Sequence, residues 1–205
     1  MANEIIKNLA TSKKVLWLIC GGSNIPYAKE AMDKVRAQAG DHIHLLTIGQ
    51  TDERYGEVGH KDSNWQQMKE IDFNFTGVQS LPILSGVSLE ETVSAYAAKI
   101  EDAFRNADVV VAQFGIGADG HVAGMLPRTG GINAKELVFG YESSPFTRVT
   151  LTPPAFMHIT NAYTFAFGTS KKEAIEKLHT DLSLEEEPCQ ILKTIPESYF
   201  YSDQL

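Results

Sequence analysis

Apolar runs of strand length alternate along this chain with stretches in which apolar residues recur every three or four positions. Runs rich in β-branched residues, such as Val109-Val110-Val111, are typical of strands buried inside a sheet. The sequence predicts strands at residues 15–20, 43–49, 107–114, 137–141, 148–152, 162–168 and 198–201. It predicts helices at 3–12, 26–35, from 63 or 64 onward, 88–104 and 169–178.

Two of these helices carry clear start signals. Ser88 and Glu91 have the spacing of a capping box, and Pro26 stands at a first-turn position directly after a glycine loop. Strands that alternate with helices in a chain of 205 residues predict one α/β domain, spanning 1–205, with a mostly parallel sheet between helical layers.

Composition narrows the class of protein. The net charge of −8 argues against a nucleic-acid-binding or acidic-membrane surface, so an anionic ligand would need a local cluster of Arg and Lys. Cys20 and Cys189 do not have the spacing of metal ligands, and we interpret both as structural residues. Two such cysteines are typical of a protein in a reducing compartment. The six apolar residues at 15–20 are too few for a secretion signal or a membrane span, and we expect a cytoplasmic protein.

The richest chemistry follows the strand at 107–114. Residues 115–121 read Gly-Ile-Gly-Ala-Asp-Gly-His, a tight turn with two titratable side chains, Asp119 and His121. The glycine spacing also satisfies the dinucleotide-binding pattern, but that pattern belongs on the first strand-to-helix turn, and Asp119 would point a carboxylate at a pyrophosphate. We therefore favour an acid–base role for this turn.

Two other segments can attract an anion. The loop at 21–24, between a strand and a helix, is a plausible phosphate cradle, although it could also be an ordinary turn. Lys171 lies in the first turn of a predicted helix, where the helix dipole disfavours a cation unless an anion is also present. His42 and His44 would share one face of a strand, but without a third ligand nearby they predict no metal site.

Several segments, in order along the chain, resemble the 6-phosphogluconolactonase and glucosamine-6-phosphate deaminase family. Residues 117–127 are similar to its G-x-D-G-H-T-A-S-L-F-P signature, and residues 51–55 with 62–64 are similar to its D-E-R and D-S-N block. Residues 21–23, 148–152 and 168–171 match three further elements. The deaminases carry a Glu in an N-E-P stretch where this chain has Met125-Leu126-Pro127, so the lactonase branch is the more similar one.

The resemblance implies a Rossmann-like α/β/α sandwich and a sugar-phosphate ligand, with no cofactor and no metal. It implies that the catalytic residues are His121, Asp119 and Asp52. It implies a substrate-binding set of Gly21, Gly22, Ser23, Asn24, Arg54, Asn64, Gly117, Arg148 and Lys171. His121 would act as a general base on water attacking a lactone carbonyl, oriented by Asp119 or by Asp52, between which the sequence does not decide.

Two other functions fit part of these features. One is a deaminase or isomerase of glucosamine-6-phosphate, and the other is a sugar-phosphate sensor without turnover. A sensor needs Arg148 and Lys171 but has no use for His121, Asp119 and Asp52 together, which favours an enzyme. We expect a monomer or small homo-oligomer that binds neither nucleic acid nor membrane.

The chain also departs from the family pattern near both ends of the expected site. One extra residue, within Asn24-Ile25, precedes Pro26 in the glycine loop, and Val122 and Gly124 replace a Thr and a Ser beside the histidine. These changes predict an altered hydrogen-bonding pattern around the loop and around His121.

Overall fold

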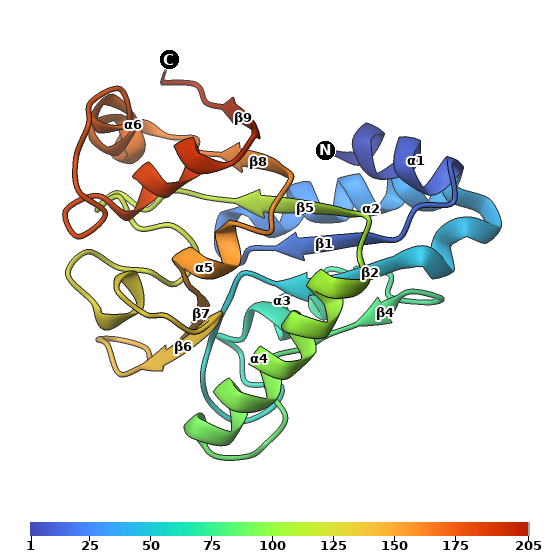
Figure 1. The fold of residues 1–205 in the computed structure, drawn as a ribbon, viewed down its shortest axis with the longest axis horizontal. Helices are drawn as coiled ribbons and strands as arrows, with labels where there is room; N and C mark the ends of the chain where they lie inside the picture. The colour runs from blue at the N-terminus through green and yellow to red at the C-terminus, as the bar shows by residue number, and fades with distance from the viewer. Residues whose placement is uncertain (205) are drawn as a thin grey trace.

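The structure, a computed structural model, describes residues 1–204. Its centre is a six-stranded sheet in the order β4-β2-β1-β5-β8-β9, in which every neighbouring pair is parallel (Figure 1). The strands are β1 (Val15–Ile19), β2 (Leu46–Gln50), β4 (Gln79–Ser80), β5 (Val109–Phe114), β8 (Asn161–Phe165) and β9 (Glu197–Tyr201). The predicted α/β class with a parallel sheet is confirmed.

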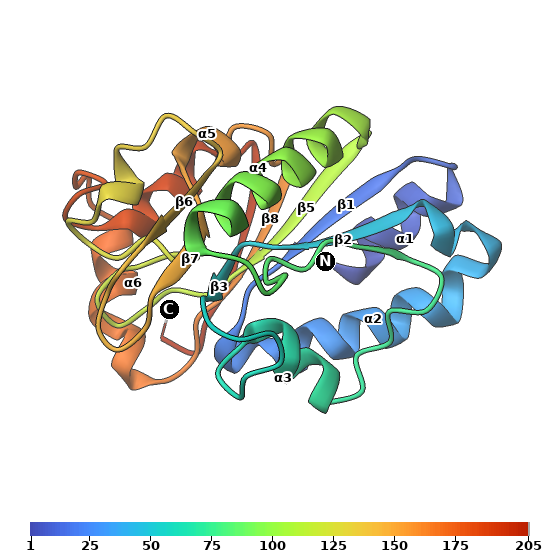
Figure 2. The ribbon, with the colours of Figure 1, turned by 90° about the horizontal axis from the view of Figure 1, so that it is seen from below.

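Helices cover both faces of this sheet (Figure 2). The α-helices are α1 (Ala2–Ala10), α2 (Ile25–Ala39), α3 (Asn64–Glu70), α4 (Leu89–Asn106), α5 (Pro153–Phe156) and α6 (Lys172–Leu178). The 3₁₀ helices are η1 (Gly22–Asn24), η2 (Gly40–Leu45), η3 (Gly130–Ile132), η4 (Thr169–Lys171) and η5 (Pro188–Thr194). Among residues 1–204, no helix is both long and apolar enough to cross a membrane.

Successive side chains of β1 point alternately to the two faces of the sheet, and each face has its own hydrophobic core. Leu16 and Leu18 pack in the core that includes residues of α4, α5 and α6, whereas Val15, Trp17 and Ile19 pack in the core formed with α1, α2 and α3. Successive side chains of a strand point to opposite faces of the sheet, so a fully apolar strand needs a helical layer on each side. This arrangement is the three-layer sandwich that the resemblance implied.

A second sheet lies beyond the carboxyl ends of the central strands (Figure 1). It has the order β3-β7-β6, it is antiparallel, and it consists of β3 (Asp52–Arg54), β7 (Arg148–Leu151) and β6 (Val138–Tyr141). Its register places Asp52 opposite Thr150 and Arg54 opposite Arg148. Residues 51–55, which carry the D-E-R block, therefore include a short strand that brings charges from distant segments together.

One predicted strand begins later than expected. The segment 43–49 was predicted to be extended, with His42 and His44 on one face, but residues up to Leu45 belong to η2 and the strand starts at Leu46. Leu46 pairs with Val15, the first residue of β1, so the preceding residues have no strand beside them to pair with. The strand prediction for His44 was wrong for this reason.

The predicted start signals are confirmed, since Pro26 stands in the first turn of α2 and the capping box at Ser88 is present. Ser88 and Glu91 form both hydrogen bonds of a capping box at the start of α4, and Ser63 caps α3 by accepting a bond from the Gln66 backbone N–H. Each such cap is worth about 1 kcal/mol.

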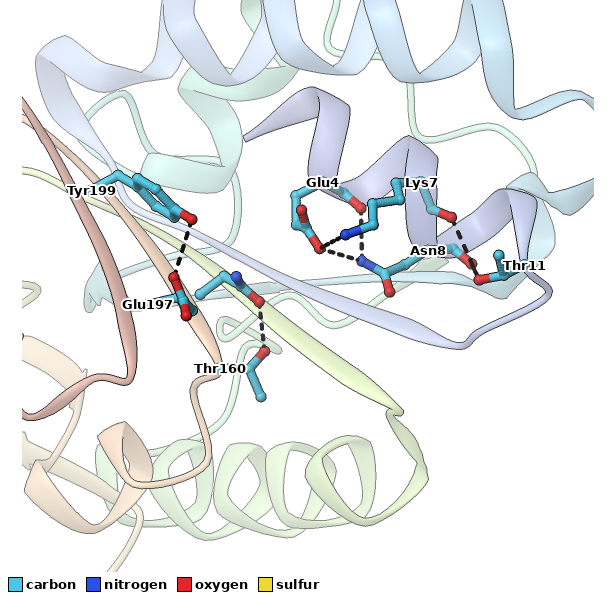
Figure 3. A network of polar contacts seen from close by, with 8 residues as sticks. Glu4, Lys7, Asn8, Thr11, Thr160, Glu197 and Tyr199 are labelled. Carbon is cyan, nitrogen blue, oxygen red and sulfur yellow. Dashed lines mark hydrogen bonds and ion pairs between the residues drawn. The ribbon is translucent and has the colours of Figure 1, made fainter.

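The amphipathic helix α1 carries one buried polar residue, Asn8. Its side-chain amide donates 2.8 Å hydrogen bonds to the backbone oxygen and the carboxylate of Glu4, one turn earlier, and Lys7 lies 3.8 Å from the same carboxylate (Figure 3). Beside this helix, the Tyr199 hydroxyl donates to Glu197 on the edge strand (Figure 3). The buried amide is thus satisfied within its own helix, and we assign it a structural role.

Candidate functional site

A cavity of about 240 Å³ lies where β1, β5 and β8 end. Ligands of parallel α/β sheets bind at this carboxyl edge. Every predicted site residue except Asp119 lines the cavity: Gly21, Gly22, Ser23, Asn24, Asp52, Arg54, Asn64, Gly117, His121, Arg148 and Lys171. The structure thus brings the dispersed motifs of the sequence into one site.

The imidazole of His121 is held by Asp119 from the same glycine turn. His121 Nδ1 lies 2.6 Å from Asp119 Oδ1, and the His121 backbone N–H donates to the same oxygen at 3.3 Å. With Nδ1 donating to the carboxylate, the neutral ring carries its acceptor lone pair on Nε2. Asp119 is outside the cavity wall but contacts His121 directly, so the geometry pairs the histidine with Asp119 rather than with Asp52.

The backbone of this turn explains its glycines. The Gly117 N–H donates to the His121 carbonyl at 2.8 Å, which closes the turn, and Gly120 has a φ of +79°. A Cβ atom added at Gly117 would overlap both the imidazole of His121 and the carboxylate of Asp119. Only glycine at 117 leaves room for the pair to form.

The hydrogen bond from His121 lowers the pKa of Asp119 from 3.8 to about 2. A carboxylate whose pKa falls on folding stabilises the folded state above its unfolded pKa, and that contribution is lost as the pH falls through the folded value. We therefore expect the stability difference between the wild-type protein and Asp119→Asn to shrink as the pH is lowered from about 4 to about 2. Urea unfolding at steps across this window measures it, and a difference that does not change with pH would contradict the pairing.

Asp52 and Cys20 contribute buried groups to the cavity wall. Asp52 is 6% exposed and accepts a 3.0 Å hydrogen bond from the Thr51 hydroxyl. Burial raises the pKa of the Cys20 thiol to about 12, and the nearby charge of Asp52 adds to this effect. Cys20 therefore stays a neutral thiol and is no nucleophile, as its interpretation as a structural residue requires.

Glu53, which the sequence reasoning did not single out, supports the site from behind. Its carboxylate is fully buried and forms no ion pair within residues 1–204. Instead, it accepts hydrogen bonds from five donors between 2.6 and 3.0 Å: Gln50 Nε2, Arg54 N, Ser63 Oγ, Asn64 N and Trp65 N. A carboxylate at the start of α3 also interacts favourably with the helix dipole. Its place in the D-E-R motif, next to a D-S-N block, was the only signal in the sequence.

Asn64 connects this support to the glycine loop. Its side-chain amide donates to the Asp52 carbonyl at 2.9 Å, and the side chain occupies the space that a Cβ at Gly21 would need. The Asn64 Oδ1 is buried and has no hydrogen-bond partner among residues 1–204. The oxygen is therefore available to a donor from a ligand.

The altered glycine loop is anchored by Asn24. Its side-chain amide donates to the backbone carbonyls of Phe114 and Phe165 at 3.3 and 3.2 Å. The Asn24 backbone carbonyl accepts a hydrogen bond from the side-chain amide of Gln113. Asn24 thus ties the ends of β5 and β8 to the loop while lining the cavity. At the other departures, Val122 is fully buried in the core, and a Cβ at Gly124 would crowd Thr150, so a larger residue at 124 does not fit there.

Three cations face the cavity without acidic partners. Arg54, Arg148 and Lys171 line it, and none of them forms an ion pair within residues 1–204. The Nε atoms of Arg54 and Arg148 are buried without a hydrogen-bond partner, although Arg54 Nη1 donates to the Asp62 carbonyl at 2.8 Å. Buried donors without partners are costly, so this arrangement favours a bound anion.

No group of three or more His, Cys, Asp or Glu side chains within residues 1–204 is placed to hold a metal ion. The fold and the cavity together define an α/β protein with a cavity lined by cations at the carboxyl edge of a parallel sheet, beside a His–Asp pair.

Comparison with known proteins shows to which family this chain belongs. Residues 1–199 match the family described as glucosamine-6-phosphate isomerases/6-phosphogluconolactonase, and the chain belongs to that family. It is 30% identical over 151 residues to a probable 6-phosphogluconolactonase 1 of Arabidopsis thaliana, an alignment that covers 65% of this chain and 56% of the plant protein. The chain thus matches little more than half the length of that relative.

Solved structures share the fold at lower identity. A 6-phosphogluconolactonase from Shewanella baltica superposes with a TM-score of 0.79 at 19% identity, covering 98% of this chain and 91% of the other. A monomeric glucosamine-6-phosphate deaminase superposes with a TM-score of 0.77 at 18% identity, covering 99% and 91%. Because the two scores are nearly equal, the fold does not separate the two branches of the family, and the choice rests on the site.

Proposed function

We propose that this protein hydrolyses 6-phosphogluconolactone to 6-phosphogluconate. The observation that carries the proposal is that His121, which contacts Asp119 through Nδ1, lines the same cavity as three cations that form no ion pair within residues 1–204. Such a cavity can bind a phosphorylated sugar and present a proton acceptor to water at the same time. The name of the plant relative supports the same reaction.

In the proposed reaction, His121 Nε2 accepts a proton from water as the water oxygen attacks the C1 carbonyl of the lactone. The C1–ring oxygen bond then breaks, and the histidine returns the proton to the departing oxygen. Asp119 keeps the ring oriented and stabilises its charged form, as a carboxylate does in other His–Asp pairs. Arg148, Lys171 and the glycine loop at 21–24 hold the phosphate, and Arg54 and Asn64 contribute further donors.

The choice of the lactonase branch rests on the carboxylates available. Among residues 1–204, Asp52 is the only acidic residue in the wall of the cavity, and Asp119 is occupied by His121. At the position where the deaminases carry their extra Glu stands the stretch Met125-Leu126-Pro127, of which Met125 is buried in the core. A deaminase would need a carboxylate that the described part of this site does not offer.

Turnover of both family substrates tests the proposal. Freshly prepared 6-phosphogluconolactone should be hydrolysed well above its spontaneous rate, measured by acid release, whereas glucosamine-6-phosphate should release no ammonia. Ammonia release would indicate the deaminase branch, and binding of both compounds without turnover would indicate a sensor. Either result would overturn the proposed reaction.

Replacing Gly117 by alanine should separate site geometry from overall stability. The added Cβ would displace His121 or Asp119, and a displacement of about 1 Å can cost roughly 10²-fold in rate. We expect a loss of lactone turnover of that order. Gly131→Ala is a matched control, since a Cβ there meets its nearest neighbours at 3.5 Å, an ordinary contact distance. Equal activity of the two variants would show that the turn tolerates the side chain.

A further inference from the structure

The ring of Phe146 lies against two of the three cavity cations. Its centroid is 5.3 Å from the guanidinium carbon of Arg54 and 5.9 Å from that of Arg148. Both distances are within the range of cation–π attraction. Phe146 is half-buried in the loop between β6 and β7 and is no part of the cavity wall.

The register of the second sheet makes this contact informative. Arg54 and Arg148 stand directly opposite each other on the antiparallel strands β3 and β7. Like charges at such a position repel and destabilise a sheet. With no acidic partner for either guanidinium within residues 1–204, the face of the Phe146 ring is the compensating feature that the structure provides.

The backbone on both sides of the ring is fixed. The Ser143 hydroxyl donates to the Phe146 carbonyl at 2.5 Å, and the Tyr55 N–H donates to the Thr147 carbonyl at 2.8 Å. The second bond extends the pairing of β3 with the β7 segment by one position. The ring is therefore held at a defined place relative to both arginines.

We propose that Phe146 is a positioning residue for anion binding, whose ring holds the side chains of Arg54 and Arg148 ready for the phosphate of the substrate. The proposal rests on the proposed function for the identity of that anion. An arginine stacked on a ring keeps its N–H edge free for hydrogen bonds, because the ring contacts its flat face. Holding both arginines against the ring beforehand lowers the ordering cost when the phosphate binds.

The test compares Phe146→Leu, which keeps an apolar side chain but removes the aromatic face, with Phe146→Tyr, which keeps that face. Inorganic phosphate binding is measured by calorimetry, lactone turnover as separate kcat and KM, and thermal stability by melting temperature. For Phe146→Leu, we expect phosphate affinity to fall and KM to rise by roughly 3- to 10-fold, the effect of losing one or two cation–π contacts. We expect kcat to change less than twofold, and Phe146→Tyr to restore the wild-type affinity.

Phe75→Leu is the matched control, since Phe75 is also half-buried and packs on aromatic rings away from the cavity, stacked on Trp65 and tilted against Phe73. It should leave phosphate affinity unchanged. Unchanged phosphate affinity in Phe146→Leu, with only a lower melting temperature, would overturn the positioning role and leave the proposed reaction standing. If the wild-type protein does not hydrolyse the lactone but Phe146→Leu binds phosphate more weakly than the wild type does, the positioning role is supported and the proposed reaction is overturned. A wild-type protein that binds no inorganic phosphate would overturn the positioning role, whereas the reaction is decided by turnover of the lactone.

Discussion

Replacing His121 by alanine is expected to lower kcat for lactone hydrolysis by about 10²- to 10⁴-fold, the usual contribution of a general base. KM should change little, because the phosphate is held by cations at other positions of the cavity. The physical reason is the geometry of the pair: Asp119 fixes one ring nitrogen at 2.6 Å, which leaves the other to accept the proton of the attacking water. Steady-state kinetics with freshly prepared lactone measures both constants.

His179→Ala is the control for this experiment. His179 is exposed at the end of α6, outside the cavity wall, so its removal should leave both constants unchanged. Near-normal turnover by His121→Ala would exclude the histidine as the base and point to Asp52, whose carboxylate belongs to the cavity wall.

Replacing Glu53 by alanine is expected to have the largest effect on stability, a loss of roughly 3 kcal/mol or more in the free energy of unfolding. The change leaves five donors without their acceptor, four of them contributed by residues that are almost completely buried, and an unsatisfied buried donor costs about 1–3 kcal/mol. Relaxation of the surrounding structure and entry of water into the vacated space reduce the summed cost of these donors. Urea denaturation monitored by tryptophan fluorescence measures the loss, since Trp65 is one of the donors.

Glu57→Ala is the matched control, an exposed acid four residues further along the same segment, and it should change stability by no more than about 0.5 kcal/mol. Glu53→Gln is informative as well. It preserves the shape of the side chain but replaces one carboxylate oxygen by an NH₂ group, which faces hydrogen-bond donors and cannot accept from them. We expect Glu53→Gln to be destabilised too. A loss below about 1 kcal/mol in Glu53→Ala would mean that the network does not hold the start of α3 in place.

Local patterns predicted most of the central sheet because burial on both faces leaves continuous apolar runs in the sequence. The same reasoning failed at 43–45, where alternation of polar and apolar residues is present but β1 offers no partner before Leu46. Strand formation depends on a neighbour, and a pattern within one segment cannot show where that neighbour ends.

The residues of the site could be predicted from their motifs, whereas their mutual contacts could not. Each motif can be recognised from its own segment of sequence: the glycine turn, the D-E-R block, and the segments around Arg148 and Lys171. The cation–π contacts of Arg54 and Arg148 with Phe146 depend on antiparallel register between strands far apart in the chain. The role of Glu53 was hidden for a similar reason, since three of its donors come from the start of α3.

The structure of the protein with bound 6-phosphogluconate tests most directly whether the cavity has an anion-binding end and an acid–base end. We expect the phosphate on Arg54, Arg148, Lys171 and the glycine loop at 21–24, and the C1 carboxylate within hydrogen-bonding distance of His121 Nε2. A product bound in the opposite direction, with its phosphate at His121, or bound outside this cavity, would contradict the proposed reaction.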